Sequence, residues 1–344
     1  MDIYHHLENT KVFIRPTSGT AIYELDLLSS GATFSQTFTE NTYGEKTLQN
    51  SGHLVKKGNF IKANPANFSF AIPLLKEDDF SASVFDLIVS LDSTNNLQSF
   101  DLFFVDQDKS FFINSCVFTS CSFSIQQGSL LSLELSGQGI KIEESGGTGS
   151  PIITDSTWSI SGVAANFSSS NIVARTSPRQ LLPLTKVLVG RTSGWTTESG
   201  VVTSTSNATR LLLQTSMELQ NNMIWLPYDS IHKGVEGEIM YPSAYTLEGR
   251  ILAGNAKWAM TSALNATEQL TARTNNTKFY ENSAWTTGAL SLVSGTDYGI
   301  KFNAASGVNI SSRISPGAIY TLDMDWRLAS NSSDISSLLT YITA

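Results

Sequence analysis

Residues 10–19 read TKVFIRPTSG, and this stretch decides the fold because the chain contains it twice. It returns at residues 185–194 as TKVLVGRTSG, with six of the ten residues identical. A second pair of stretches, IQQGSLLSLEL at 125–135 and ISPGAIYTLDM at 314–324, follows in the same order. Self-similarity of this kind predicts that one structural unit is encoded twice.

The spacing between matching stretches rises from 175 to 189 residues along the chain. Duplicated domains with small insertions produce matches that keep their order in this way, whereas convergent β-strand composition would not keep the order so well. We place the main insertion, of about 12 residues, within 253–289. We therefore expect a first copy at 1–145, a linker and connecting segment at 146–180, and a second copy at 181–344.

Each copy is predicted to be mainly β, in the α+β class. Apolar residues alternate with polar ones in several short runs, which is typical of half-buried strands. Residues 78–91 instead repeat at helical spacing after two aspartates that suit a helix N-terminus. In the first copy we expect strands at 11–15, 33–41, 66–75, 100–105, 111–125 and 129–142, with one helix from about 78.

The second copy is expected to repeat this order, with its helix around 258–272. Short antiparallel strands with one helix per copy predict two tandem β-sandwiches or open barrels, each flanked by a helix. Between the early strands of the first copy, residues 43–66 are predicted to form a long arm loop. Loops of this length inside a compact domain are usually functional or disordered.

Charge and hydropathy narrow the function classes. The 344 residues carry a net charge of −8 and only 15% charged residues. That sign disfavours a protein that grips nucleic acid, because phosphate contacts need a basic patch. No apolar run approaches a membrane span, and the N-terminus lacks a signal-peptide layout. Low charge suits surfaces that end up against other subunits, although a mildly acidic monomer is equally compatible.

Catalytic and metal motifs are not found in the sequence. Cys116 and Cys121 lie five apart in a predicted strand, which places them on opposite faces and disfavours a disulfide. His5 and His6 are adjacent and no zinc spacing supports them. No nucleophile elbow, P-loop or dinucleotide fingerprint occurs. We expect no catalytic residues, no metal and no cofactor, and so a protein that is not an enzyme.

The predicted arm loop is basic, and its counterpart in the second copy, at 232–242, is acidic. If the two copies alternate around a ring, each arm meets a surface unlike its own, and charge complementarity then sets the order. A solvated, mobile loop is the alternative. The residues predicted to make inter-subunit contacts are Lys46, Lys56, Lys57, Asn59 and Lys62 in the basic arm, and Glu236 and Glu238 in the acidic arm.

Residues 34–91 resemble the tail tube, or major tail, proteins of long-tailed bacteriophages. The resemblance is carried by FSQTFTENTYGEKT, then by GNFIKANPANFSFAIPLLKEDD, and then by the predicted helix. It covers most of 1–142 and reaches 180–331 mainly through the internal repeat. Residues 152–180 and 332–344 have no counterpart in a minimal tube protein.

The resemblance implies a structural virion protein. Its members form stacked rings around a hollow lumen, and chains with two tube domains form trimers that act as pseudo-hexamers. The implied partners are other copies of the chain, a tape-measure protein, and the tail terminator and distal tail proteins. DNA is expected to pass through the lumen without specific binding. The implied location is the virion tail, assembled in the host cytoplasm and without membrane contact.

Two other functions stay open from the sequence. One is a tandem β-sandwich binding module of a virion, which would recognise a carbohydrate or a receptor. The other is an unrecognised hydrolase, which the missing nucleophile–base set disfavours. Filament formation separates the first of these from the tube prediction.

Overall fold

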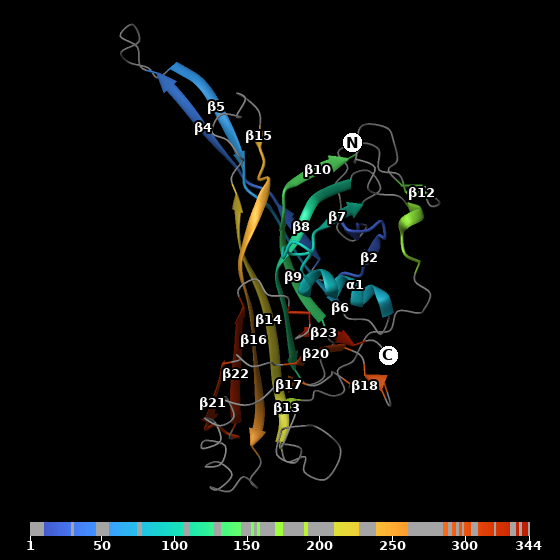
Figure 1. Cartoon of the computed structure of the whole chain (residues 1–344), viewed down its shortest axis with the longest axis vertical. Coiled ribbons are helices and arrows are strands. Elements are labelled where there is room, and N and C mark those ends of the chain that lie inside the picture. Colours follow the sequence, from blue (N-terminus) through green and yellow to red (C-terminus); the bar gives the residue numbers. More distant parts are fainter. Residues whose placement is uncertain are drawn as a thin grey trace.

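The structure is a computed structural model of the whole chain (Figure 1). The residues it describes are 10–28, 31–45, 55–73, 78–105, 110–126, 132–145, 153–154, 157–158, 169–174, 189–191, 210–226, 239–260, 285–287, 291–293, 296–297, 299–303, 309–319, 321–330, 335–336 and 339–342.

The first half of the chain contains ten strands and one helix among the described residues. They are β1 (Lys11–Pro16), β2 (Tyr23–Leu25), β3 (Ala32–Ser35), β4 (Phe38–Glu45), β5 (Val55–Ala63), β6 (Ala66–Pro73), α1 (Asp78–Val89), β7 (Phe100–Val105), β8 (Ser110–Gln126), β9 (Ser132–Gly139) and β10 (Lys141–Ser145). The mainly β prediction is confirmed. The predicted strand at 129–142 is two strands, because a bend at Ile140 separates β9 from β10.

Strand β8 belongs to two sheets. Its first part pairs with β7 and β10, and its second part pairs with β9. Strands β2, β1 and β7 extend one sheet, while β9, β6 and β3 extend the other in that order. The two sheets bury one aromatic core in which the rings of Phe68, Phe100 and Phe118 pack within about 6 Å of each other, centroid to centroid.

Helix α1 begins at Asp78, as predicted from its acidic start. It buries Val84, Leu87 and Ile88 in the same core, so the helical spacing of apolar residues is confirmed. The two cysteines also lie together in this core, both free and both buried. The prediction that they face opposite ways is wrong, because a register shift between Phe118 and Ser120 restores the inward direction.

The predicted loop at 43–66 is wrong for most of the part that the structure describes, and residues 46–54 lie outside the described residues. Strands β4 and β5 pair antiparallel from Phe38 with Ala63 out to Glu45 with Val55. They form a hairpin that projects from the body of the molecule (Figure 1), and we call it the arm hairpin. The sequence pattern hid it because GEK, NSG and KKG punctuate a strand pair whose polar residues alternate with few apolar ones.

The connecting segment and the second half are also built of strands, with one short helical turn. Its described elements are β11 (Ile153–Thr154), β12 (Thr157–Trp158), η3 (Ser169–Asn171), β13 (Val189–Arg191), β14 (Arg210–Leu226), β15 (Ile239–Met240), β16 (Ala244–Met260), β17 (Trp285–Thr287), β18 (Ser291–Val293), β19 (Thr296–Asp297), β20 (Gly299–Asn303), β21 (Asn309–Ser315), β22 (Thr321–Ser330) and β23 (Leu339–Ile342). The predicted helix at 258–272 is wrong at its start, because β16 runs to Met260. The rest of that prediction lies outside the described residues.

Both halves pair their strands in one order. In the first half the neighbours are β3-β6-β9-β8, and in the second they are β14-β16-β22-β21. A second series matches as well, with β1-β7-β8-β10 in the first half and β13-β17-β20-β23 in the second. The long strand β8 of the first half corresponds to two strands, β20 and β21, of the second. This order supports the duplication inferred from the sequence, which stays a prediction.

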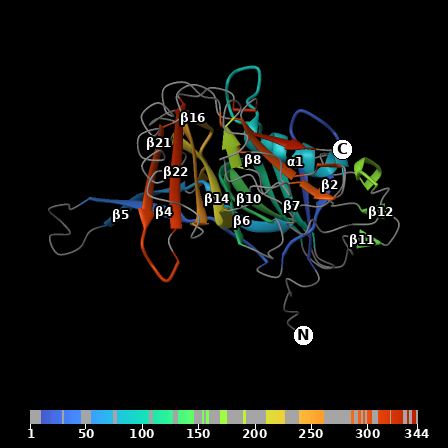
Figure 2. The same ribbon diagram turned by 90° about the horizontal axis from the view of Figure 1, so that it is seen from below.

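One contact joins the halves into a single sheet. Strand β8 pairs antiparallel with β14, from Ser120 with Gln220 to Gln126 with Gln214. The eight strands β3-β6-β9-β8-β14-β16-β22-β21 are therefore continuous. Figure 2 shows β8, β14, β16, β22 and β21 side by side in this order.

Candidate assembly and channel surface

Pairing between the strands aligns residues in rows that cross the continuous sheet. One row runs through seven strands and is apolar throughout. It consists of Ala32, Phe70, Leu135, Cys121, Leu219, Leu252 and Leu328. Six of these seven residues are buried in the main core, so this side of the sheet is the side that α1 covers.

The rows on either side of it point the other way, because side chains alternate along a strand. We call the surface that they form the polar face. One of its rows is Thr33, Ser69, Ser136, Ser120, Gln220, Ile251 and Ala329, and the other is Ala71, Glu134, Ser122, Glu218, Ala253, Arg327 and Asn309. Hydroxyl, amide and carboxylate groups thus spread across strands of both halves.

The polar face carries a one-sided charge over its first five strands. On β3, β6, β9 and β8, and on β14 from Gln214 to Leu226, the positions that alternate with the buried row include Glu134 and Glu218 but no lysine or arginine. Both glutamates are exposed, and one strand separates them. A phosphate group meets no cation on this part of the sheet, so tight binding of nucleic acid is disfavoured there.

Neighbouring side chains on this face bind one another. The hydroxyl oxygens of Thr33 and Ser69 lie 2.8 Å apart. Gln138 donates from Nε2 to Asn67 Oδ1 at 2.9 Å. Gln220 donates from Nε2 to Glu218 Oε1 at 2.7 Å. Cross-strand and same-strand contacts of this kind order a polar sheet surface. They also occupy donors that could otherwise bind a passing molecule.

The far end of the face, on β22 and β21, is different because charges of both signs occur there. Arg313 Nε lies 3.4 Å from Asp323 Oδ2, and Ser315 donates to the same oxygen at 2.7 Å. Arg327 and Asp325 are exposed on β22. Since the side chain of Arg313 is 74% exposed, its ion pair contributes little, about 0–1 kcal/mol.

The arm hairpin holds part of the predicted contact set. Lys56, Lys57 and Asn59 lie on β5, where the structure describes the backbone, and Lys62 is exposed on the same strand. Lys46, Glu236 and Glu238 lie outside the described residues. Strand β15, which directly follows the acidic stretch, pairs parallel with β5 through Ile239 with Ile61. The base of the basic arm therefore lies beside β15, the strand that follows the acidic stretch in sequence.

Exposed apolar side chains occur near the base of the arm hairpin. Phe38 on β4 is 51% exposed, and Ile239 on the adjoining β15 is 39% exposed. Ile224 and Leu226, at the end of β14, are 51% and 42% exposed. The sequence prediction missed these residues, because single apolar residues in polar strands look like core positions until the pairing is known.

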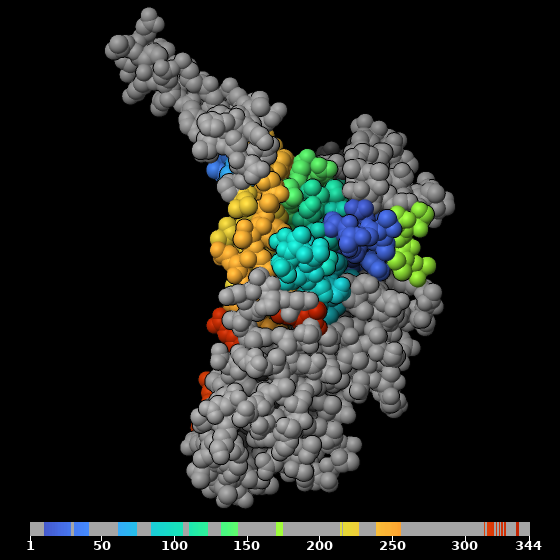
Figure 3. Space-filling view, in the orientation of Figure 1, coloured from blue at the N-terminus to red at the C-terminus, as the bar shows by residue number. Residues whose placement is uncertain are grey.

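A buried arginine ties the two halves together. Arg250 on β16 is 1% exposed and donates to the backbone oxygens of Val89, at 2.7 Å, and Ile88, at 3.0 Å, in the last turn of α1. A cation at a helix C-terminus meets carbonyl oxygens that lack helical partners. Figure 3 shows β16, in orange, directly against the cyan surface formed around residues 84–105. No motif in the sequence pointed to this residue.

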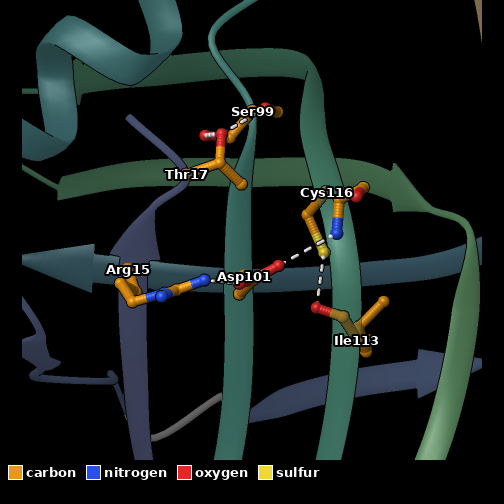
Figure 4. Close-up of polar contacts among 7 residues, drawn as sticks. Arg15, Thr17, Ser99, Asp101, Ile113 and Cys116 are labelled. Atoms are coloured by element: carbon orange, nitrogen blue, oxygen red, sulfur yellow. Dashed lines mark hydrogen bonds and ion pairs between the residues drawn. The ribbon is translucent and has the colours of Figure 1, made fainter. Parts of the chain in front are cut away.

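A second buried charge fixes the place where β8 changes sheets. Asp101 on β7 is 3% exposed, forms an ion pair with Arg15, and accepts a hydrogen bond from the backbone N–H of Ser115 at 3.1 Å (Figure 4). Ser115 has a φ of 49°, a left-handed conformation that is uncommon for a serine. The carboxylate thus holds the bend that lets one strand serve both sheets.

Neither metal ligands nor membrane spans are seen in the part of the chain that the structure describes. No group of three or more His, Cys, Asp or Glu side chains could hold a metal ion there, and no described helix is long and apolar enough to cross a membrane. All four histidines, at positions 5, 6, 53 and 232, lie outside the described residues.

Comparison with known proteins gives little. No protein-family model and no curated protein matches the sequence. Thirteen chains of solved structures match, among them one from the cryo-EM structure of the anti-feeding prophage (AFP) baseplate. That chain is 7% identical, and the alignment covers 42% of this protein and 97% of the baseplate chain with a TM-score of 0.30. A TM-score this low does not establish a shared fold.

Proposed function

We propose that this chain is the structural subunit of a phage tail tube, in which copies assemble into rings, the rings stack, and DNA passes through the lumen. The polar face is the single observation that carries this proposal. It runs continuously over both halves, has a buried apolar side behind it, and carries no lysine or arginine from β3 across to the part of β14 that begins at Gln214. A surface of this kind can line a channel that a polyanion crosses without sticking.

The continuous sheet also supports ring formation. A heterologous contact between identical chains gives a ring where the rotation closes. If each half supplies one unit, three chains make a ring of six similar units. The proposed assembly is therefore a homotrimer that behaves as a pseudo-hexamer, with no catalytic activity and no cofactor.

The arm hairpin supports stacking. It leaves the body of the molecule and carries the exposed Lys62, with Lys56, Lys57 and Asn59 on the same strand. We propose that it reaches the neighbouring ring, where the apolar residues at its base become covered. Surface ion pairs contribute only about 0–1 kcal/mol each, so apolar and sheet contacts supply most of the assembly energy while the charges set the register.

The proposed partners are further copies of the chain, a tape-measure protein that sets the length, and the tail terminator and distal tail proteins at the two ends. The proposed location is the virion tail after assembly in the host cytoplasm. Each of these follows from the tube proposal and falls with it.

Negative-stain electron microscopy with light scattering tests the proposal. The purified protein, concentrated alone and with a tape-measure partner, is expected to form hollow rings or tubes. The double variant Lys56→Glu/Lys57→Glu is expected to remain folded and to lose stacking. A protein that stays monomeric at every concentration, with or without the partner, would favour the binding-module alternative.

A further inference from the structure

The junction between the two halves is a template for contacts between chains. Seven consecutive residue pairs join β8 to β14 in antiparallel register. In the order of pairing, β8 is the last strand of the first series, β3-β6-β9-β8, and β14 is the first strand of the second, β14-β16-β22-β21. The internal junction therefore joins the last strand of one unit to the first strand of the next.

The two ends of the continuous sheet are also a first strand and a last strand of these series. Strand β3 begins the first series, and β21 ends the second. Among the described strands, β3 pairs only with β6, and β21 pairs only with β22. An open strand edge is a template for pairing with another chain, and proteins either block such edges or use them.

We propose that β21 of one chain pairs antiparallel with β3 of a second copy, so that the polar face continues from chain to chain. This inference rests on the proposed function and adds the edges at which the ring closes. The partner is a second copy because the two free edges repeat the two sides of the internal junction. In the order of pairing, β21 corresponds to β8 and β3 corresponds to β14. The contact is heterologous, and so it adds chains in one direction until a ring closes.

The residue types on the two edges fit this pairing. On β3, Thr33 and Ser35 lie on the polar face, and Ala32 starts the buried row. On β21, Ser311 and Arg313 stand in register with Asp325 and Asp323 of the polar face, and the alternate positions are Ile310, Ser312 and Ile314. Apart from Ser312, apolar residues occupy the alternate positions on both edges. Antiparallel pairing therefore keeps the polar positions of the two edges on one side.

The proposed contact is weaker than the internal junction for two reasons. Strand β3 has four residues, whereas the internal junction uses seven pairs. The internal junction is also clamped by Arg250 on β16, whose counterpart in the pairing order is β6. Because β6 reads ANFSFAIP and holds no arginine or lysine, the contact between chains lacks this clamp. Single contacts are then reversible, and ring closure is needed to hold them together.

Disulfide trapping tests the inference. Thr33→Cys or Ser35→Cys is combined in one chain with Ser311→Cys, Arg313→Cys or Ser315→Cys, which gives six double variants that cover the possible registers. Both native cysteines are buried, so the unsubstituted protein is the background control. Each variant is kept only if its thermal unfolding midpoint matches that of the unsubstituted protein. Assembled protein is then oxidised and analysed on non-reducing gels.

At least one double variant is expected to give linked dimers and trimers. Mixing its two parent single variants is expected to give dimers only. The pair Ser93→Cys with Arg313→Cys is the matched control, since Ser93 is exposed in the turn after α1, and no link is expected from it. Dimers from Thr33→Cys alone would mean that two β3 edges meet, and this would overturn the inference.

Electron microscopy of the same samples separates the two proposals. Rings or tubes without any cross-link between the edges would overturn the edge pairing and leave the tube function standing. Absence of both rings and cross-links would overturn both. Cross-linked closed trimers would support both.

Discussion

The Nε atom of Arg250 donates a hydrogen bond of 2.8 Å to the Oδ1 atom of Asn221, and both side chains are buried. Asn221 in turn donates from Nδ2 to the backbone oxygen of Phe118 on β8, at 2.8 Å. Since Arg250 also binds the end of α1, these two residues connect β16, β14, β8 and the helix. A buried network of this kind rigidifies the junction only while every member is satisfied.

Replacing Arg250 is therefore expected to destabilise the whole chain. Arg250→Ala leaves the last carbonyls of α1 and the amide oxygen of Asn221 without their partner, at a cost of about 1–3 kcal/mol for each buried group left unsatisfied. Arg250→Lys is expected to restore only part of this, because an ammonium lacks the planar fork. Urea unfolding measures both. Arg327→Ala, at an exposed position on β22, is the matched control and is expected to change stability by less than about 0.5 kcal/mol.

Gly137 is predicted to reject any side chain. A Cβ atom at this position would lie 2.1 Å from Cζ of Phe68 and 2.5 Å from the backbone oxygen of Val117. Gly137→Ala is expected to lower the free energy of unfolding by about 1–3 kcal/mol through overpacking. Gly19→Ala is the control, because nothing lies within 4 Å of its Cβ position. Equal effects of the two substitutions would contradict the packing found around β9.

Asp101 is expected to matter more than an exposed ion pair. Asp101→Asn removes the buried charge that faces the partly buried Arg15 and weakens the acceptor for the N–H of Ser115, with an expected loss of about 3–5 kcal/mol. Glu24→Gln is the comparison, since the Glu24–Lys11 pair is partly exposed with a separation of 3.7 Å, and its loss is expected to cost at most about 1 kcal/mol. Thermal unfolding followed by circular dichroism measures both.

Alkaline pH is expected to unfold the protein. Burial raises the pKa of the Cys121 thiol from 9.0 to about 12, and burial together with Asp92 raises the pKa of Tyr245 from 10.0 to about 12. Burial likewise raises the pKa of Cys116. The folded state then holds protons that the unfolded state releases, so these groups leave the free energy of unfolding unchanged below about pH 9 and lower it as the pH rises towards 12. Each buried thiol contributes up to about 1.4 kcal/mol per pH unit in that window, and Tyr245 contributes less because it is partly exposed and solvent screens it.

The slope of the free energy of unfolding against pH tests whether the buried thiols cause this loss of stability. Cys121→Ala is expected to flatten it between pH 9 and 12, even though the cavity lowers stability at every pH. The native thiols are also expected to resist alkylation at pH 8 until urea unfolds the chain. Rapid modification of both thiols in the folded protein would contradict their burial.

Adding cations to the polar face is expected to make assembled protein bind DNA. The double variant Glu134→Lys/Glu218→Lys replaces the two exposed acids of the first five strands and should retain short duplexes in a salt-sensitive way. Asp86→Lys is the control, since Asp86 is exposed on α1, which packs on the opposite side of the sheet. Equal DNA retention by both variants would contradict a channel lined by the polar face.

Local patterns in the sequence predicted much of the first half. The strand at 100–105 and the helix from Asp78 were found because alternation and helical spacing depend on neighbouring residues alone. The arm hairpin was missed because glycines and polar residues punctuate its two strands, and the true length of β16 was missed because it depends on pairing with β14 and the distant β22. Serines at every second position, as in SCSFS at 120–124, were the available signal for the polar face. Arg250 and Asp101 gave no signal, because their partners lie 161 and 86 residues away along the chain.

The central claim is that the polar face lines the lumen of a closed ring, and a cryo-EM reconstruction of the assembled protein tests it most directly. We predict a hollow ring of three chains in which Glu134, Ser120 and Glu218 face the lumen, and β21 of each chain adjoins β3 of the next. A ring with this face turned outwards, or a particle without a lumen, would contradict the account.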